Sequence, residues 1–247
     1  MTALLRWTIR IHKWVALIVG IQIVLWVAGG VVMSVIPIET VRGEHNIAPP
    51  EAMNFDLPNL ISVQAAAEAA RPAGGLAGAQ LEGWQGRPVW NITARSGSSV
   101  LVDALDGTVL TPINRERAIE IARADYAGDP EIAAVTYFEE PTWESRRPGP
   151  TWRIDFADGE GTRIYVSENS GLVVARRNDA WRFYDFFWML HIMDYGEREN
   201  FNNPLLITFS IFSLLTVFAG LLLLVMRIQR LFAMEIARRE REKGLRP

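Results

Sequence analysis

Two apolar stretches decide the fold: Trp14–Ile36, WVALIVGIQIVLWVAGGVVMSVI, and Pro204–Met226, PLLITFSIFSLLTVFAGLLLLVM. Each contains 23 residues and no charged side chain. An α-helix needs about 20 such residues to cross a hydrocarbon core of about 30 Å, because it rises about 1.5 Å per residue. Both stretches are therefore predicted to be transmembrane helices that enclose one polar block of sequence.

The first stretch also has features of a secretory signal peptide, because Arg6, Arg10 and Lys13 precede it. Its apolar core is longer than the roughly 7–15 residues of a signal peptide, and Ile36-Pro37-Ile38-Glu39 offers no small-x-small cleavage site. An uncleaved membrane anchor is the favoured interpretation, and a cleaved signal is the alternative.

The distribution of charge predicts the orientation. Residues 1–13 carry three basic and no acidic side chains, and residues 227–247 carry seven basic and three acidic ones. Residues 14–226 carry 15 basic and 25 acidic side chains. Because basic flanks stay in the cytoplasm, we expect both termini inside and the central domain on the outer side of the membrane. The acidic balance argues against nucleic acid as a partner, and the absence of cysteine excludes disulfides and thiolate ligands.

Segments 59–110 and 113–175 repeat one pattern, in which a short helix precedes alternating strands. The matching parts are the helices 62–71 and 115–126, the Trp-x-Ile strands 88–94 and 150–156, and the segments 101–110 and 165–174. Asn114 is expected to cap the second helix, and Gly107 and Gly171 are expected to adopt positive φ at the turn before the last strand. The repeat predicts two α+β units, each an antiparallel sheet with one helix packed on it.

This pattern resembles the PepSY domain, and a tandem pair between membrane helices is similar to the PepSY-associated transmembrane helix family of bacterial inner membranes. Ile11-His12-Lys13-Trp14 and Met189-Leu190-His191 resemble helix motifs of that family, and the resemblance covers residues 6–230. Family members with more spans include iron-uptake and ferric-siderophore reductases that hold haem in the membrane. The expected domains are an N-terminus with the first transmembrane helix (1–37), a linker with the first repeat (38–110), the second repeat (111–178), an interfacial aromatic helix with a loop (179–203), and the second transmembrane helix with a basic tail (204–247).

Histidine is the strong haem and transition-metal ligand available, and the chain contains His12, His45 and His191. His12 is predicted at the cytoplasmic end of the first span, and the other two near the outer face. Because a span is about 30 Å long, His12 and His191 of one chain cannot ligate one iron. A bis-histidine pair would need His45 and His191, and His12 would need a partner chain or Met226. The alternative is that these histidines are polar residues at the lipid boundary; we expect no cofactor, with b-type haem as the alternative.

Several residues are candidates for contacting a partner. The aromatic segment 181–195 is too short to span the bilayer, so it is predicted to lie at the outer headgroups; a re-entrant or buried helix against partner subunits is the alternative. A polar amide within the first span favours a hydrogen bond to another helix, either within the chain or in a larger complex. The candidate contacts are Gln22, Trp143, Arg146, Arg147, Trp181, Phe187 and Trp188.

The sequence contains no hydrolase, metalloprotease or nucleotide-binding motif. Glu139 and Glu140 are adjacent carboxylates, but they precede the segment 141–150, which is predicted to be a solvated loop. The sequence therefore favours a non-enzymatic accessory or scaffold subunit that binds a membrane or periplasmic complex, or itself as a homo-oligomer. The alternatives are a haem-containing transmembrane oxidoreductase linked to iron or siderophore reduction, and a regulator of a periplasmic protease.

Overall fold

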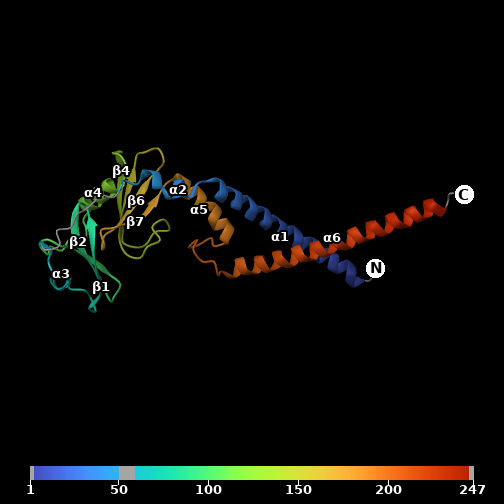
Figure 1. Ribbon diagram of the computed structural model, residues 1–247, viewed down its shortest axis with the longest axis horizontal. Helices are drawn as coiled ribbons and strands as arrows, with labels where there is room; N and C mark the ends of the chain where they lie inside the picture. Colours follow the sequence, from blue (N-terminus) through green and yellow to red (C-terminus); the bar gives the residue numbers. More distant parts are fainter. Residues whose placement is uncertain (1–2, 50–58, 245–247) are drawn as a thin grey trace. The chain divides into compact units, whose positions relative to one another are not determined.

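The computed structural model describes residues 3–49 and 59–244 (Figure 1). The segment 50–58, part of the expected linker, lies outside the described residues, as do residues 1–2 and 245–247 at the ends. The chain divides into two compact units. The helical unit comprises residues 1–35 and 185–247, and the sheet unit comprises residues 36–184. The predicted α+β arrangement, with two long apolar helices flanking a sheet-containing region, is confirmed.

The helical unit is built on α1 (Ala3–Val35) and α6 (Pro204–Gly244), which contact each other. Their segments His12–Val35 and Pro204–Arg241 have a mean hydropathy of 2.5 and are long and apolar enough to cross a membrane. In an 18-residue apolar stretch of each segment, only 17% and 6% of the residues, respectively, are buried within the protein. The helix α6 includes the predicted helical tail and continues beyond the N-terminal end of α1 (Figure 1).

The sheet unit contains two antiparallel sheets, each with one helix. Sheet 1 has the strand order β1-β2-β3 and sheet 2 the order β4-β5-β6-β7. The elements of the first repeat are α3 (Val63–Ala70), β1 (Leu76–Trp84), β2 (Arg87–Ala94) and β3 (Ser99–Asp103). Those of the second are α4 (Arg115–Asp125), β4 (Ile132–Phe138), β5 (Thr151–Phe156), β6 (Arg163–Ser167) and β7 (Val173–Arg177). Two short helices, α2 (Ile38–Arg42) and η1 (Glu44–Asn46), precede the repeats, and α5 (Asp179–Ile192) follows them.

The indole of each Trp-x-Ile strand makes the same hydrogen bond. Trp90 Nε1 donates to the carbonyl of Ile61 at 3.1 Å, and Trp152 Nε1 donates to the carbonyl of Ile113 at 3.3 Å. Each acceptor lies two residues before the helix of its own repeat. An indole N–H needs a partner when it is buried, and here that partner ties the central strand to the start of the helix in both repeats.

The caps and turns of the two repeats also match. Ser62 and Asn114 cap α3 and α4 by accepting the backbone N–H three residues further on. Gly107 and Gly171 adopt φ values of 81° and 62°, and each donates its N–H to the carbonyl four residues earlier. The predicted helices, Trp-x-Ile strands and glycine turns are therefore confirmed. The last strand expected after Gly107 is reduced to the single bridge between Val102 and Val109, and the strands β1 and β4 were not predicted.

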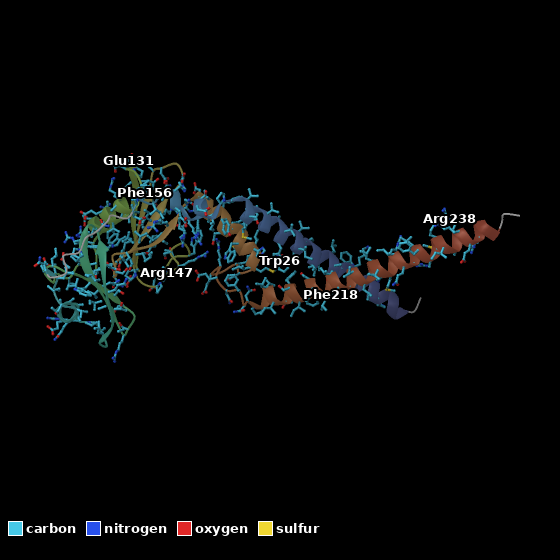
Figure 2. All side chains as sticks on the ribbon, viewed as in Figure 1. Trp26, Glu131, Arg147, Phe156, Phe218 and Arg238 are labelled. Atoms are coloured by element: carbon cyan, nitrogen blue, oxygen red, sulfur yellow. The ribbon has the colours of Figure 1, made fainter. Side chains whose placement is uncertain are left out.

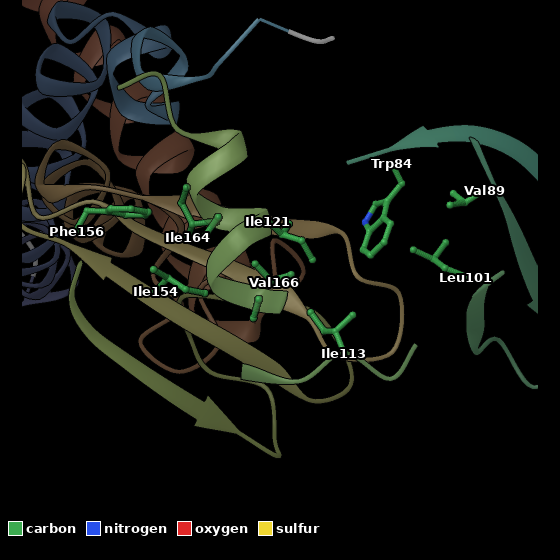
Figure 3. Close-up of a cluster of buried hydrophobic side chains, with 11 residues drawn as sticks. Trp84, Val89, Leu101, Ile113, Ile121, Ile154, Phe156, Ile164 and Val166 are labelled. Carbon is green, nitrogen blue, oxygen red and sulfur yellow. The ribbon is translucent and has the colours of Figure 1, made fainter. Parts of the chain in front are cut away.

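One buried cluster joins the repeats (Figure 3). Trp84 and Leu101 of sheet 1 belong to the same cluster as Ile121 of α4 and Ile154 of β5. Trp84 Nε1 also donates a hydrogen bond of 2.8 Å to the carbonyl of Gly171 in the second repeat. The helix α3 packs against the other side of sheet 1. Sheet 1 is thus covered on both faces, by its own helix and by the second repeat.

Candidate functional site

The repeats differ most between their first two strands. The strands β1 and β2 are joined by the two-residue turn Gln85-Gly86, in which both residues have positive φ. The strands β4 and β5 are joined by residues 139–150, here called the insert; Arg147 on it is labelled in Figure 2. Phe138 and Thr151 are paired across the two strands, so the insert leaves and re-enters sheet 2 at neighbouring positions.

The insert covers a polar face of sheet 2. In the first repeat the corresponding face carries Val89 and Leu101, which are buried against the second repeat. The equivalent positions in the second repeat are Thr151 and Tyr165, and both are 1% exposed. Since no third repeat follows, the insert takes the place that a further repeat would occupy, and it must satisfy polar rather than apolar side chains.

A carboxylate of the insert provides the polar partner. Glu144 is 2% exposed and accepts hydrogen bonds from Arg163 Nη1 at 2.9 Å, Arg182 Nε at 3.0 Å and the Tyr165 hydroxyl at 2.6 Å. Arg177 Nε also donates to the Glu144 carbonyl at 2.8 Å. A buried carboxylate is tolerated only when it is paired and hydrogen-bonded. These contacts fix the insert on sheet 2 and on the first turn of α5.

The prediction that segment 141–150 is a solvated loop is wrong for two of its residues. Glu139 and Glu140 are exposed, as expected, but Glu144 and Ser145 are buried. The Ser145 hydroxyl lies 3.2 Å from the hydroxyl and 3.2 Å from the carbonyl of Thr142, within a short turn. The prediction failed because the partners of Glu144 come from strands and a helix that follow it in the chain.

The contacts of Glu144 shift two pKa values. Burial by itself raises the pKa of Glu144, but the hydrogen bonds from Tyr165 and Arg182 and the charges of Arg182 and Arg163 outweigh it, so the pKa lies below its ordinary value. Burial, followed by the hydrogen bond to Glu144, raises the pKa of Tyr165 to about 12. Glu144 is therefore ionised and Tyr165 neutral across the physiological pH range.

The outer surface of the insert presents an aromatic side chain on an ordered base. Trp143 is 48% exposed and stacks on Trp181, with ring centroids 5.6 Å apart. The guanidinium groups of Arg146 and Arg177 lie 5.2 and 4.2 Å from the centre of the Trp181 ring. Trp181 is itself only 9% exposed, so it supports Trp143 instead of offering a surface of its own. Arg147, the next residue in the chain after Arg146, is exposed.

The structure does not bring His12 and His191 together. The ring of His191 lies 6.4 Å from that of Trp26, which is 14 residues after His12 on α1. At about 1.5 Å per residue these 14 residues span about 21 Å. His45 belongs to the sheet unit, where its Nε2 lies 2.9 Å from Glu160 Oε2. Within residues 3–49 and 59–244, no group of three or more metal-ligating side chains is found.

Polar atoms are buried in the helical unit. His191 Nδ1, Trp26 Nε1 and Ser213 Oγ have no hydrogen-bond partner among the described residues. Gln22 is only 8% exposed. Gln22 is thus buried within the helical unit.

The aromatic helix α5 ends at Ile192, three residues before the predicted end. Asp185 is 3% exposed and pairs with Arg198 at 2.6 Å. Trp188 Nε1 donates to the Arg198 carbonyl at 3.1 Å, and Phe187 is partly buried, with its backbone carbonyl facing Gly29 of α1. Both aromatic candidates thus contact the helical unit, to which residues 185–192 of α5 belong.

Sequence reasoning missed Glu144 and its arginine partners, since the surrounding Pro-Thr-Trp-Glu-Ser-Arg-Arg-Pro-Gly-Pro has the composition of a loop. Only the alignment of the two repeats indicates the site. It shows that the second repeat has an added segment, and that Thr151 and Tyr165 stand where the first repeat has Val89 and Leu101. No protein-family model, curated protein or solved structure matches this chain.

Proposed function

We propose that the chain is an inner-membrane protein that crosses the bilayer with α1 and α6 and acts as a non-enzymatic accessory or scaffold subunit. A core helix of a soluble protein with this hydropathy would be mostly buried, whereas α1 and α6 leave most of their apolar surface uncovered. The basic flanks favour cytoplasmic termini. The sheet unit then lies in the periplasm as a tandem PepSY-like domain, which binds the partner.

The observation that carries the binding role is the half-exposed Trp143 on its fixed base. Tryptophan and arginine are among the residue types enriched at the energetic centre of protein interfaces, and the insert exposes Trp143 and Arg147. Trp181 and the buried Glu144 hold Trp143 in one place, so little side-chain freedom remains to be lost when a partner binds. We therefore assign the outer surface of the insert, with Trp143, Arg146 and Arg147, as the contact surface.

A photo-crosslinking phenylalanine analogue at position 143 tests this function in intact membranes. We expect a covalent adduct of the full chain after illumination. The matched control is the same analogue at Leu105, which is 53% exposed in the sheet unit but lies on a turn of the first repeat; it should give no adduct. Efficient incorporation at position 143 with no adduct would show that this surface binds no protein.

Transmembrane electron transfer is a second candidate, and it is favoured by His191 Nδ1, which is buried and has no hydrogen-bond partner in the described part of the chain. The residues do not fit a haem with two axial histidines of the helical unit, because His12 lies about 21 Å along α1 from the neighbour of His191. A reduced-minus-oxidised spectrum of the purified chain, with His12→Ala and His191→Ala alongside, separates the two candidates. A b-type signal lost in either variant would replace the accessory role, and a flat spectrum would support it.

A further inference from the structure

We propose that the partner of the insert is a second copy of this chain, bound across a two-fold axis that passes close to Trp143. The inference rests on the proposed function, because it uses both the membrane anchoring and the binding role of the insert. It names the partner that the proposed function leaves open.

The charge pattern of the insert is antisymmetric about Trp143. Glu139 and Glu140 precede Trp143 by four and three residues, and Arg146 and Arg147 follow it by three and four. The other charged residue in this segment, Glu144, is buried and already paired within its own chain. A two-fold axis at Trp143 therefore places the acidic pair of one copy opposite the basic pair of the other.

The fold of the insert keeps both arms near its central tryptophan. The backbone N–H of Arg146 donates to the Thr142 carbonyl at 3.0 Å, so the chain turns back at Trp143. Both ends of the insert return to the paired positions Phe138 and Thr151. Glu139, Glu140, Trp143 and Arg147 are exposed, whereas Arg146 is half-buried over the Trp181 ring. The pairing therefore depends chiefly on Arg147 of one copy and Glu139 of the other. The side chains that a self-complementary surface requires are thus on one short, ordered segment.

Membrane insertion restricts how two copies can meet. Two chains inserted in the same direction form a closed dimer only by rotation about the membrane normal, so each contributes the same patch. A patch of one sign would repel its copy, whereas the insert carries both signs. Residues 36–184 contain 21 acidic and 14 basic side chains, but charges further apart than about 8 Å are screened at physiological salt. The local pattern therefore decides the pairing.

The insert alone is smaller than a standard interface, which covers about 800 Å² on each partner. We therefore expect weak self-association that depends on the two chains sharing one membrane, since confinement raises their effective concentration. Dilution in detergent should dissociate the dimer.

The absence of native cysteine gives a direct test. Full-length chains with Glu139→Cys and with Arg147→Cys, carrying different tags, are expressed together and oxidised in membranes. A disulfide requires Cβ atoms within about 4.5 Å, so we expect the two variants to crosslink to each other, while neither crosslinks when it is expressed alone. The matched control pairs Arg147→Cys with Ser96→Cys, an exposed residue in the first repeat. No crosslink in the mixture, or equal crosslinking in the control, would overturn the proposal.

Charge exchange supplies a second readout that does not depend on cysteine. With the photo-crosslinker at position 143, Glu139→Arg or Arg147→Glu alone should lower the yield of the self-adduct by about tenfold, equivalent to about 1.4 kcal/mol. The double exchange Glu139→Arg with Arg147→Glu should restore it. An adduct with a different protein would contradict the self-association but support the proposed function. No adduct at all would contradict both.

Discussion

At the scale of single residues, Glu144 is the group whose loss the fold should tolerate least. Glu144→Gln removes the buried carboxylate that Arg163 and Arg182 share, while each arginine keeps an ion pair with a more exposed carboxylate, Asp155 or Asp179. Breaking a buried ion pair from one side costs about 3 kcal/mol or more, although partial exposure of both arginines reduces this cost. We expect a loss of about 2 kcal/mol in the free energy of unfolding, measured by denaturation of the full chain in detergent. The exposed Glu139→Gln should change it by less than about 0.5 kcal/mol.

The same carboxylate makes stability depend on pH with a definite sign. The pKa of Glu144 in the folded protein lies below the ordinary value of 4.5, so the folded state favours the ionised form. Its contribution is complete above pH 4.5 and is lost as the pH falls through the lower, folded pKa. The Tm difference between the wild type and Glu144→Gln should therefore be largest near pH 7 and shrink below pH 4.5. A difference that grows in acid would contradict this assignment.

The equivalent glycines Gly107 and Gly171 should respond differently to one substitution. Both have positive φ, so alanine strains the backbone by about 1 kcal/mol at either position. A Cβ at Gly107 would meet only Ile61 at 3.6 Å, an ordinary contact, whereas at Gly171 it would lie 3.1 Å from the Trp84 ring. Overpacking adds about 1–3 kcal/mol. Thermal unfolding should therefore show Gly171→Ala to be the more destabilised variant, and equal losses would mean that the repeats do not pack through Trp84.

At the scale of elements, the insert should determine the ionisation of Tyr165. Replacing residues 139–150 by Asn-Gly joins Phe138 to Thr151 through a two-residue turn like that of the first repeat. This change removes both the burial and the Glu144 partner that raise the pKa of Tyr165 to about 12. Ultraviolet titration should show the pKa of this tyrosine falling toward its ordinary value of 10.0.

Comparison with Tyr165→Phe in the same background assigns the signal to this residue, because burial and the hydrogen bond to Asp158 also raise the pKa of Tyr126 to about 12. A raised Tyr165 pKa favours folding below pH 10 and loses its effect as the pH rises toward 12. The shortened chain should therefore lose less stability than the wild type over that interval. Retention of a pKa near 12 after the replacement would mean that sheet 2, and not the insert, buries the hydroxyl.

The elements that the sequence predicted are those with a local signal. The Trp-x-Ile strands alternate clearly, and the helices carry their own caps at Ser62 and Asn114. The missed strands β1 and β4 lie at sheet edges. The strand β1 contains two alanines, two glycines and no β-branched residue, so its sequence carries no strand signal. The strand β4 does contain β-branched and aromatic residues, but they do not alternate with polar ones. The sequence around Glu144 does not indicate its burial either, because its partners Arg163 and Arg182 are 19 and 38 residues away in the chain.

At the scale of the whole molecule, duplication explains why the candidate site is in the second repeat. In the first repeat, the face of sheet 1 that its own helix does not cover packs against the second repeat through Trp84 and Leu101. The second repeat has no neighbour of this kind, so its equivalent face is polar and is closed by the insert. End units of repeat proteins commonly carry polar caps for this reason. The insert is also the segment that the first repeat lacks, and its exposed outer surface favours it as a binding site.

The proposed topology gives the last prediction, which uses single cysteines in a chain that has none. Ser96→Cys lies in an exposed loop of the sheet unit, and Glu240→Cys lies on the exposed, charged end of α6. If α1 and α6 both cross the membrane with basic flanks inside, a membrane-impermeant maleimide should label Ser96→Cys in intact cells after the outer membrane is opened. Glu240→Cys should react only when the inner membrane is permeabilised. Labelling of Ser96→Cys only after that permeabilisation would reverse the topology and place the insert in the cytoplasm, whereas recovery of both variants in the soluble fraction would remove the membrane proposal itself.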